Sequence, residues 1–543
     1  MKIKKYSISP FYWLAISIIA MGGILASYKP VYSQSPSPTP SPASITPQPS
    51  LQWSQPIALS DPLVKSWFPD VATSVDGSVH VVWASTSQSG TAGADVVIPA
   101  QAAEEASGFD VVMYTSSQNG MVWATPNDIA AIPQTGGSEA TRPSLYIDLY
   151  DRLHLTYRGM LVYYSNAPVD FAALAAYWSP GFVINYNQVA YFSRLTQDRF
   201  GMLHLIYTEN SPSAECEICY HLYYRRSTDN GSTWSESAEI SQGIEGVAKP
   251  QILIDAENNL YIVYEKGIGG SYGHLDDPTS VMMVTSNDGG LTWNNPQVIS
   301  GEVENAKNIT IGLDGKGQLV TAWLNTVLDV MEYRVSADQG KSWTEPAPIP
   351  GVLGGWSLYN TPLDDYSMVT DSAGVIHFAA VGRTPETKAS LSLLHLTWDG
   401  VTWSTPNVVV TLTGDAPEWP RLAIGSGNQV HLVWFVRDAA HLWDSDRGLY
   451  RVWYAQAISS APQVKATPLP EYSPTPTSPA LVVAFETPTP MPTSTPNPVL
   501  QQIPPPSGSI YNETDEVILI ALSLIPALLI LTGLVIVIRL RQR

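Results

Sequence analysis

Short segments in which apolar and polar residues alternate recur along most of this chain. A typical unit runs from Lys249 to Tyr264 (KPQILIDAENNLYIVY): an apolar run, a turn containing Asp, and a second run that ends in an aromatic residue. Alternation with a period of two, together with abundant Val, Tyr and Trp, predicts half-buried β-strands. The units recur at intervals of mostly about 50 to 60 residues, which is typical of propellers and solenoids. They begin at Phe68, Arg142, Phe192, Lys249, Lys307, Tyr366 and Pro420.

Three corners between strands share one eight-residue pattern. They read STDNGSTW, SNDGGLTW and SADQGKSW, and in each of them Ser, Asp, Gly and Trp have the same spacing. Asp accepts backbone N–H bonds across a tight turn, Gly supplies a positive φ, and Trp begins the next strand. In a fourth, weaker copy, SSQNGMVW, Gln118 stands where Asp is expected. We therefore expect a structural role for Ser227, Asp229, Gly231, Trp234, Ser286, Asp288, Gly290, Trp293, Ser336, Asp338, Gly340 and Trp343.

Each unit continues with a third strand, a corner, and a fourth strand that begins with Trp and usually contains Pro. The last unit lacks this fourth strand, whereas the segment WSQPIALS, from Trp53 to Ser60, has its form and precedes the first unit. We expect this segment to complete the last unit and to pair an otherwise open sheet edge. The sequence therefore predicts an all-β, seven-bladed β-propeller over residues 51–461, with four-stranded antiparallel blades and six blades as the alternative.

The corner pattern resembles the Asp box, or BNR repeat, of the sialidase-like β-propellers of the neuraminidase superfamily. This resemblance implies the fold, and it raises exo-α-sialidase or related glycoside hydrolase chemistry as one possible function. Sialidases bind the substrate carboxylate with three arginines and carry an Arg-Ile-Pro motif in the first inner strand. The corresponding stretch here is Trp67-Phe68-Pro69. We therefore expect recognition of a glycan or protein ligand, with the hydrolase as the alternative, and whether the chain is an enzyme stays open.

Both ends of the chain have the composition of targeting and anchoring segments. Residues 1–33 carry three lysines before an apolar run and are typical of a signal peptide, expected to be cleaved, or of an N-terminal anchor. Residues 517–538 are uncharged and long enough to span a bilayer, and three arginines in the tail 539–543 place this end in the cytoplasm. The Pro-rich segments 34–50 and 462–516 are expected to be an extended linker and stalk. The sequence thus predicts a single-pass cell-membrane protein with an extracellular propeller, anchored in the membrane by its C-terminal helix.

The chain is acidic, with a formal net charge of −20 and only 28 Lys and Arg residues. This balance argues against nucleic acid as a partner of the folded domain. A glycan or a surface protein remains as the expected partner. The sequence indicates no cofactor and no metal site.

Candidate ligand-binding residues lie where the inner strands of the blades begin. In a propeller this end also carries the longest loops, and residues that differ between blades are the functional candidates there. Just before the first apolar residue of each inner strand the units carry Asp70, Ser144, Arg194, Gln251, Asn308, Ser367 and Arg421. Arginine is the natural partner of a carboxylate. The selected candidates are Asp70, Arg142, Arg194, Lys249, Glu265 and Arg421, and the alternative is that these residues are ordinary solvated strand ends.

The two cysteines and five of the histidines allow simpler readings. Cys216 and Cys219 lie in a long loop that is expected to be extracellular, which favours a local disulfide, with half of a zinc site as the alternative. Five histidines occupy the same position in five units, so we expect them to be structural. They are His80, His154, His204, His377 and His431.

Overall fold

The computed structural model describes most of the predicted propeller. The described residues are 51–87, 109–133, 141–186, 188–212, 216, 218–241, 246–268, 275, 277–301, 305–358, 363–412, 414–438 and 450–465. The predicted signal peptide, linker, membrane span and tail, and all but the first residues of the stalk, lie outside this set. Within it, no helix has both the length and the apolar character needed to cross a bilayer.

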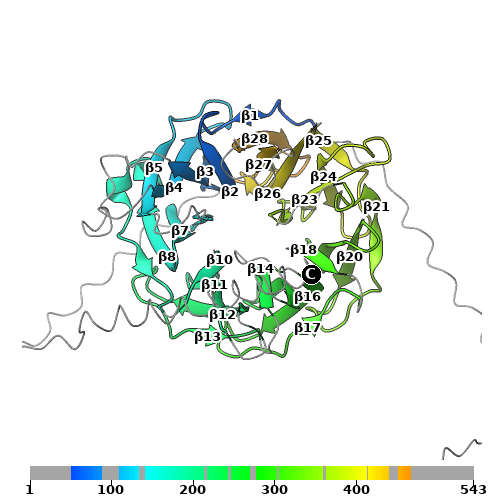
Figure 1. Cartoon of the computed structure of the whole chain (residues 1–543), viewed down its shortest axis with the longest axis horizontal. Helices are drawn as coiled ribbons and strands as arrows, with labels where there is room; N and C mark the ends of the chain where they lie inside the picture. The colour runs from blue at the N-terminus through cyan, green and yellow to red at the C-terminus, as the bar shows by residue number, and fades with distance from the viewer. Residues whose placement is uncertain are drawn as a thin grey trace, which may run out of the picture. The chain divides into compact units, whose positions relative to one another are not determined.

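The described strands form seven four-stranded antiparallel sheets arranged in a ring (Figure 1). Blades one and two contain β2 (Lys65–Thr73), β3 (Val79–Ser87), β4 (Phe109–Ser117), β5 (Asn127–Pro133), β6 (Ser144–Ile147), β7 (Arg152–Arg158), β8 (Val162–Pro168) and β9 (Phe182–Val183), with two short 3-10 helices at Val169–Phe171 and Ala175–Tyr177. Blades three and four contain β10 (Ala190–Gln197), β11 (Leu203–Asn210), β12 (Tyr220–Ser227), β13 (Ala238–Glu239), β14 (Gly246–Ile254), β15 (Leu260–Ile268), β16 (Asp277–Ser286) and β17 (Gln297–Val298). Blades five to seven contain β18 (Ala306–Leu313), β19 (Leu319–Asn325), β20 (Val330–Ser336), β21 (Ala347–Leu353), β22 (Ser367–Thr370), β23 (Ile376–Gly382), β24 (Ser392–Trp398), β25 (Asn407–Thr411), β26 (Asp415–Gly425), β27 (Gln429–Asp438), β28 (Arg451–Ile458) and β1 (Ile57–Ala58). The prediction of seven blades is confirmed.

The ring closes through its first strand, as predicted. β1 is the outer strand of blade seven and pairs with β28, with Ile57 opposite Tyr454 and Ala58 opposite Trp453. The Ser54 N–H also donates to the Gln456 carbonyl at 2.8 Å. The ends of the propeller are therefore held together in one sheet, and Figure 1 shows β1 on the rim beside β28.

Apolar side chains between neighbouring blades form the core. Between blades three and four, for example, Ile206 and Leu222 belong to the same buried cluster as Val247, Ile262 and Val284. Because each blade buries both faces against its neighbours, the strands alternate between two apolar sets rather than between core and solvent. This packing fixes the inner strands around the centre of the ring, where the candidate residues lie.

The three predicted corners have the expected hydrogen bonds. In the corner of blade three, Ser227 Oγ accepts from the Gly231 N–H at 2.9 Å, and Asp229 Oδ1 accepts from the Thr233 N–H at 2.8 Å. In blade one the corner is one residue shorter than the alignment on Trp123 implied. The acceptor there is Asn119, whose Oδ1 binds the N–H groups of Met121 and Val122, and not Gln118.

The tryptophans of the corners are less buried than the motif suggested. Trp234, Trp293 and Trp343 are only partly buried, and each packs at the edge of an inter-blade cluster. Trp293, for instance, contacts Tyr224 of the preceding blade edge-on, with 4.9 Å between the ring centroids.

Candidate functional site

In or just before each of five inner strands, one residue lies in the left-handed backbone region. These five residues are Phe68, Arg142, Lys249, Asn308 and Trp419, with φ between 42° and 59°, and we call them the bulge residues. The register of the inner strand shifts at this point in blades one, four, five and seven. Positive φ costs a non-glycine residue about 1 to 3 kcal/mol, and a β-bulge redirects the side chain. Here these side chains reach residues of other blades across the centre of the ring.

Two aromatic bulge residues, Phe68 and Trp419, contact each other. The Trp419 ring lies edge-on to Phe68, with centroids 5.0 Å apart, and stacks on Phe192 at 6.1 Å. The Arg142 guanidinium lies 4.7 Å from the Phe68 ring centroid and 4.6 Å from that of Phe192. Blades one, two, three and seven thus meet in an apolar and cation–π contact.

The bulge residues Lys249 and Asn308 form a separate, polar contact. Lys249 Nζ lies 3.2 Å from Glu265 Oε1, donates to Asn308 Oδ1 at 2.9 Å and to the Asp364 carbonyl at 2.7 Å, and its side chain is 1% exposed. Asp364 Oδ1 accepts from the Trp419 N–H at 3.0 Å. Burial, reinforced by the nearby charge of Glu418, raises the pKa of Asp364 well above its ordinary value. Lys249 and Glu265 therefore form a buried structural pair.

Directly beyond the bulge, one residue per inner strand faces its neighbours around the ring. The strand pairing places Asp70 opposite Val82, Arg194 opposite Ile206 and Arg421 opposite Val433. In blade five the equivalent residue is Thr310, opposite Ala322, and not Asn308 as expected. Asn308 was expected at this position, but it belongs to the bulge, which adds residues before the strand resumes its register.

Several of these residues converge on a carboxylate that the sequence did not single out. Arg421 Nη2 donates to Asp365 Oδ2 at 2.6 Å, and Gln251 Nε2 donates to Asp365 Oδ1 at 3.1 Å. Arg194 Nη2 lies 3.8 Å from the same Oδ2. The Asp365 side chain is 1% exposed. The only signal for Asp365 in the sequence was an acidic residue in blade six at the position where other blades carry a bulge residue.

Arg194 lies between two carboxylates without a direct hydrogen bond. Its Nη1 is 3.9 Å from Asp70 Oδ2, and no hydrogen bond joins its guanidinium to any described residue. Burial and the charge of Arg421 lower the pKa of Arg194 to about 10, so that it stays protonated at neutral pH. Asp70, Arg194, Gln251, Asp365 and Arg421, which we call the central cluster, carry two positive and two negative charges. The central cluster is therefore neutral.

The structure thus divides the predicted site residues into three groups. Asp70, Arg194 and Arg421 meet in the central cluster. Arg142 lies in the aromatic contact, and Lys249 and Glu265 form the buried pair. Of the three candidate arginines, Arg194 and Arg421 therefore lie together, and the chain itself supplies their carboxylate partner.

Comparison with known proteins identifies the repeats. A BNR repeat-like domain matches residues 186–432. This ring is a sialidase-like BNR-repeat β-propeller. A sialidase from Micromonospora viridifaciens is 39% identical over 83 residues, which span 13% of this chain and 13% of that protein.

Solved structures similar to this propeller share little sequence with it. A protein of unknown function from Dyadobacter fermentans is 12% identical, with a TM-score of 0.45, over 76% of this chain and 100% of that chain. An ulvan lyase of polysaccharide lyase family 25 has the same identity and TM-score over 72% and 95% of the two chains. The NanB sialidase of Streptococcus pneumoniae is 11% identical, with a TM-score of 0.39, over 77% and 71%. Likenesses at this level carry no argument about chemistry.

Much of the loop sequence at the end of the BNR propeller that carries the bulge residues lies outside the described residues. This applies to residues 88–108 in blade one, to 269–274 and 276 in blade four, and to 439–449 in the last blade. In the insertion after β11, Cys216 and Cys219 form a disulfide, with 5.8 Å between their α-carbons. The half zinc site considered for this pair is therefore not formed.

Proposed function

We propose that this protein is a membrane-anchored, cell-surface BNR propeller that binds a glycan or a protein ligand through its loop-bearing face and does not hydrolyse sialosides. The observation that carries the proposal is the contact between Arg421 and Asp365 at 2.6 Å. The arginines that would bind the carboxylate of sialic acid already share a carboxylate of the chain.

A ligand carboxylate would have to compete with Asp365. Asp365 also accepts from Gln251 and from the Tyr366 N–H at 3.0 Å, so its position is fixed by three donors. Separating a buried ion pair leaves an uncompensated charge and costs about 3 to 5 kcal/mol. Trp419 also packs on both arginines of this cluster, with its ring centroid 4.3 Å from the Arg421 guanidinium and 5.6 Å from that of Arg194.

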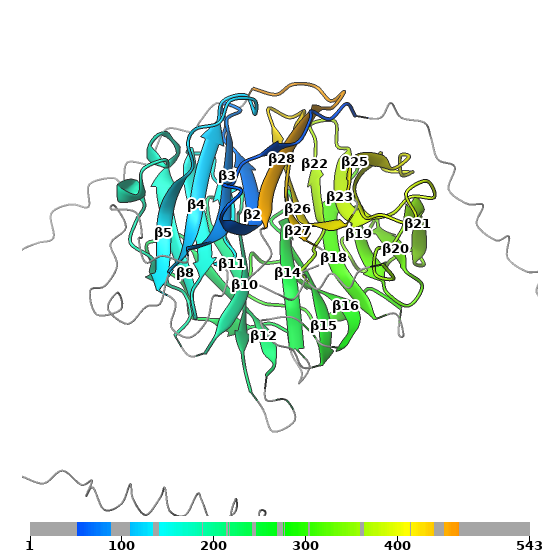
Figure 2. The same ribbon diagram turned by 45° about the horizontal axis from the view of Figure 1, so that its top comes forward.

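The direction of the chain ends supports the choice of face. β28 ends beside the turn between β26 and β27, where the Ser459 N–H donates to the Asn428 carbonyl and the Val464 N–H to the Ser426 carbonyl. Figure 2 shows the first and the last described segments, in blue and orange, on this same side of the ring. A stalk that continues from residue 465 would leave from the end opposite the long loops.

Two assays on the full-length protein test the proposal. A fluorogenic sialoside should show no turnover, and a glycan array or a panel of surface proteins should show saturable binding. Replacing loop residues should weaken that binding, whereas Arg194→Ala should leave it unchanged. Sialoside turnover that is lost in Arg194→Ala or Arg421→Ala would contradict the proposal and support the hydrolase.

A further inference from the structure

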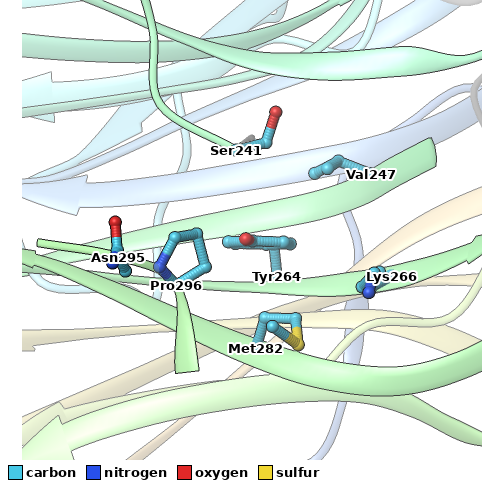
Figure 3. A pocket seen from close by; sticks show the side chains of 7 residues that line it. All are labelled: Ser241, Val247, Tyr264, Lys266, Met282, Asn295 and Pro296. Atoms are coloured by element: carbon cyan, nitrogen blue, oxygen red, sulfur yellow. The ribbon is translucent and has the colours of Figure 1, made fainter. Parts of the chain in front are cut away.

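A cavity of about 350 Å³ lies between blades three and four, away from the central cluster (Figure 3). This volume is at the small end of the range for ligand pockets in proteins. Blade four supplies most of the wall through β14, β15, β16 and the segment before β17. The lining residues are Val247, Tyr264, Lys266, Met282, Asn295 and Pro296, with Ser241 from the end of blade three.

Tyr264 presents to this cavity a hydroxyl that has no hydrogen-bond partner among the described residues. Its side chain is 1% exposed and lies at the centre of the lining residues in Figure 3. This hydroxyl is therefore open to a partner that enters the cavity. Burial raises the pKa of Tyr264, so the hydroxyl stays protonated and can both donate and accept.

The equivalent tyrosine of blade three shows why this hydroxyl is left free. Tyr207 in β11 corresponds to Tyr264 in β15, and its hydroxyl lies 2.6 Å from Ser237 Oγ. Ser237 is three residues beyond Trp234, and the residue three beyond Trp293 in blade four is Pro296. Proline has no hydroxyl, so Tyr264 loses this partner. Blades one, five and seven place the larger, fully buried Trp83, Trp323 and Trp434 at this position instead.

The wall offers both polar and apolar contacts. Ser241 Oγ accepts from the Leu222 N–H at 3.1 Å, which leaves its own proton free to be donated. Val247 and Met282 are buried and present hydrocarbon and thioether surface, and Asn295 is exposed at the rim. A ring with hydroxyl groups at its edge and C–H groups on its face matches this combination.

We propose that this cavity binds one sugar ring of a glycan, with a sugar hydroxyl hydrogen-bonded to Tyr264 and the C–H face against Val247 and Met282. The choice of a sugar rests on the proposed glycan binding, and it names a subsite for it. The subsite uses none of the arginines of the central cluster. Lys266 lies near the loop end of β15, whereas Asn295 and Pro296 follow the Asp-box corner at the other end of the blade, so the cavity is lined from both ends.

The test uses the full-length protein in a detergent without a sugar headgroup, titrated with methyl glycosides of glucose, galactose, mannose and N-acetylglucosamine. At least one should bind saturably, with a Kd of about 10 mM or tighter. Tyr264→Phe removes only the hydroxyl and should weaken binding about 2- to 12-fold, the value of one net hydrogen bond. Tyr264→Trp introduces the side chain of three other blades and should abolish binding.

Two further variants keep the result interpretable. Tyr207→Phe removes the equivalent hydroxyl of blade three and should leave binding unchanged. Pro296→Ser gives the Tyr264 hydroxyl the serine partner found in blade three and should therefore weaken sugar binding. This variant tests the subsite independently of whether Tyr264→Trp folds. Absence of saturable binding in the wild type would overturn the subsite. So would wild-type affinity in both Tyr264→Phe and Pro296→Ser. Glycan-array binding that persists in Tyr264→Trp would overturn the subsite but leave the proposed function standing. Sialoside turnover would contradict only the proposed function.

Discussion

Gly290, in the Asp-box corner of blade four, lies against the hydroxyl of Tyr224 in blade three. A Cβ at this position would overlap with the Tyr224 ring, and the backbone φ of Gly290 is 80°. The Tyr224 hydroxyl lies 2.7 Å from His204 Nδ1 and 3.5 Å from the Gly289 carbonyl. The corner is therefore a contact between blades as well as a turn, and the His–Tyr pair behind it extends the contact into the preceding blade.

This contact predicts different effects for two adjacent glycines. Gly289 also has a positive φ, 69°, but a Cβ there would meet no atom within 4 Å. Gly289→Ala should therefore lower the free energy of unfolding by about 1 kcal/mol, through backbone strain alone. Gly290→Ala should cost about 2 to 4 kcal/mol, because strain and overlap with Tyr224 add. Urea unfolding of both variants measures the difference, and equal midpoints would show that Tyr224 does not restrict the corner.

Ring closure predicts that a short N-terminal deletion acts on the whole propeller. Deleting Trp53 to Ser60 removes β1 and exposes the edge of β28 in blade seven, so the ring should unfold at lower temperature. Deleting residues 35–50 removes only the expected linker and is the control. Thermal unfolding of the two variants decides the point, and indistinguishable melting temperatures would mean that β1 contributes nothing to closure.

The framework of this propeller was predictable because it is written in local repeats. The spacing of Ser, Asp, Gly and Trp determines each corner within eight residues. The segment from Trp53 resembles the other fourth strands in sequence, and this similarity predicts its pairing. The motif did not reveal that Trp293 is only partly buried, because it does not contain how far a corner protrudes from the neighbouring blade.

The central cluster was predictable only in part. Asp70, Arg194 and Arg421 were found because they differ between repeats at one position. Asp365 was missed because its contact with Arg194 depends on which blades face each other across the ring, which no local pattern contains. The bulge does have a local sequence signal, because four of the five bulge residues precede a proline.

Buried histidines predict that the propeller loses stability in mild acid. Burial lowers the pKa of His80 and of His431 to about 4, whereas a histidine of the unfolded chain titrates near pH 6.5. Between these values the unfolded chain binds more protons, so the free energy of unfolding falls as the pH falls. Asp364 and Glu418, whose pKa values are raised by burial, act in the opposite direction.

Single variants separate these opposing effects. His80→Gln and His431→Gln should each reduce the loss of unfolding free energy between pH 7 and pH 5 by about 2 kcal/mol. Urea unfolding at the two pH values gives this quantity for each variant and for the wild type. An unchanged pH dependence in both variants would mean that these histidines do not titrate differently on folding.

The expected membrane topology predicts where the chain is open to proteases. A reporter fused after Arg543 should be cytoplasmic, because three arginines follow the uncharged span. Protease added to intact cells should cut the stalk between residues 466 and 516 and release the propeller, which the closed ring protects. Release should fail in a variant that lacks the sequence 466–516 and joins the propeller directly to the span. A stalk that is protected in intact cells would contradict the topology.

The two arginines of the central cluster predict unequal costs of removal. Arg421 makes a direct hydrogen bond to the buried Asp365, so Arg421→Met leaves that carboxylate without its cation. This substitution should lower the free energy of unfolding by about 3 to 5 kcal/mol. Arg194 is 17% exposed and stays 3.8 Å or more from both of its carboxylates, so Arg194→Met should cost no more than about 1 kcal/mol. The double variant Arg421→Met with Asp365→Leu removes both charges and should recover part of the loss. Unfolding free energies of the four proteins test this. If Arg194→Met were as costly as Arg421→Met, Arg194 would be a structural ion-pair partner, and the assignment of Asp365 chiefly to Arg421 would be wrong.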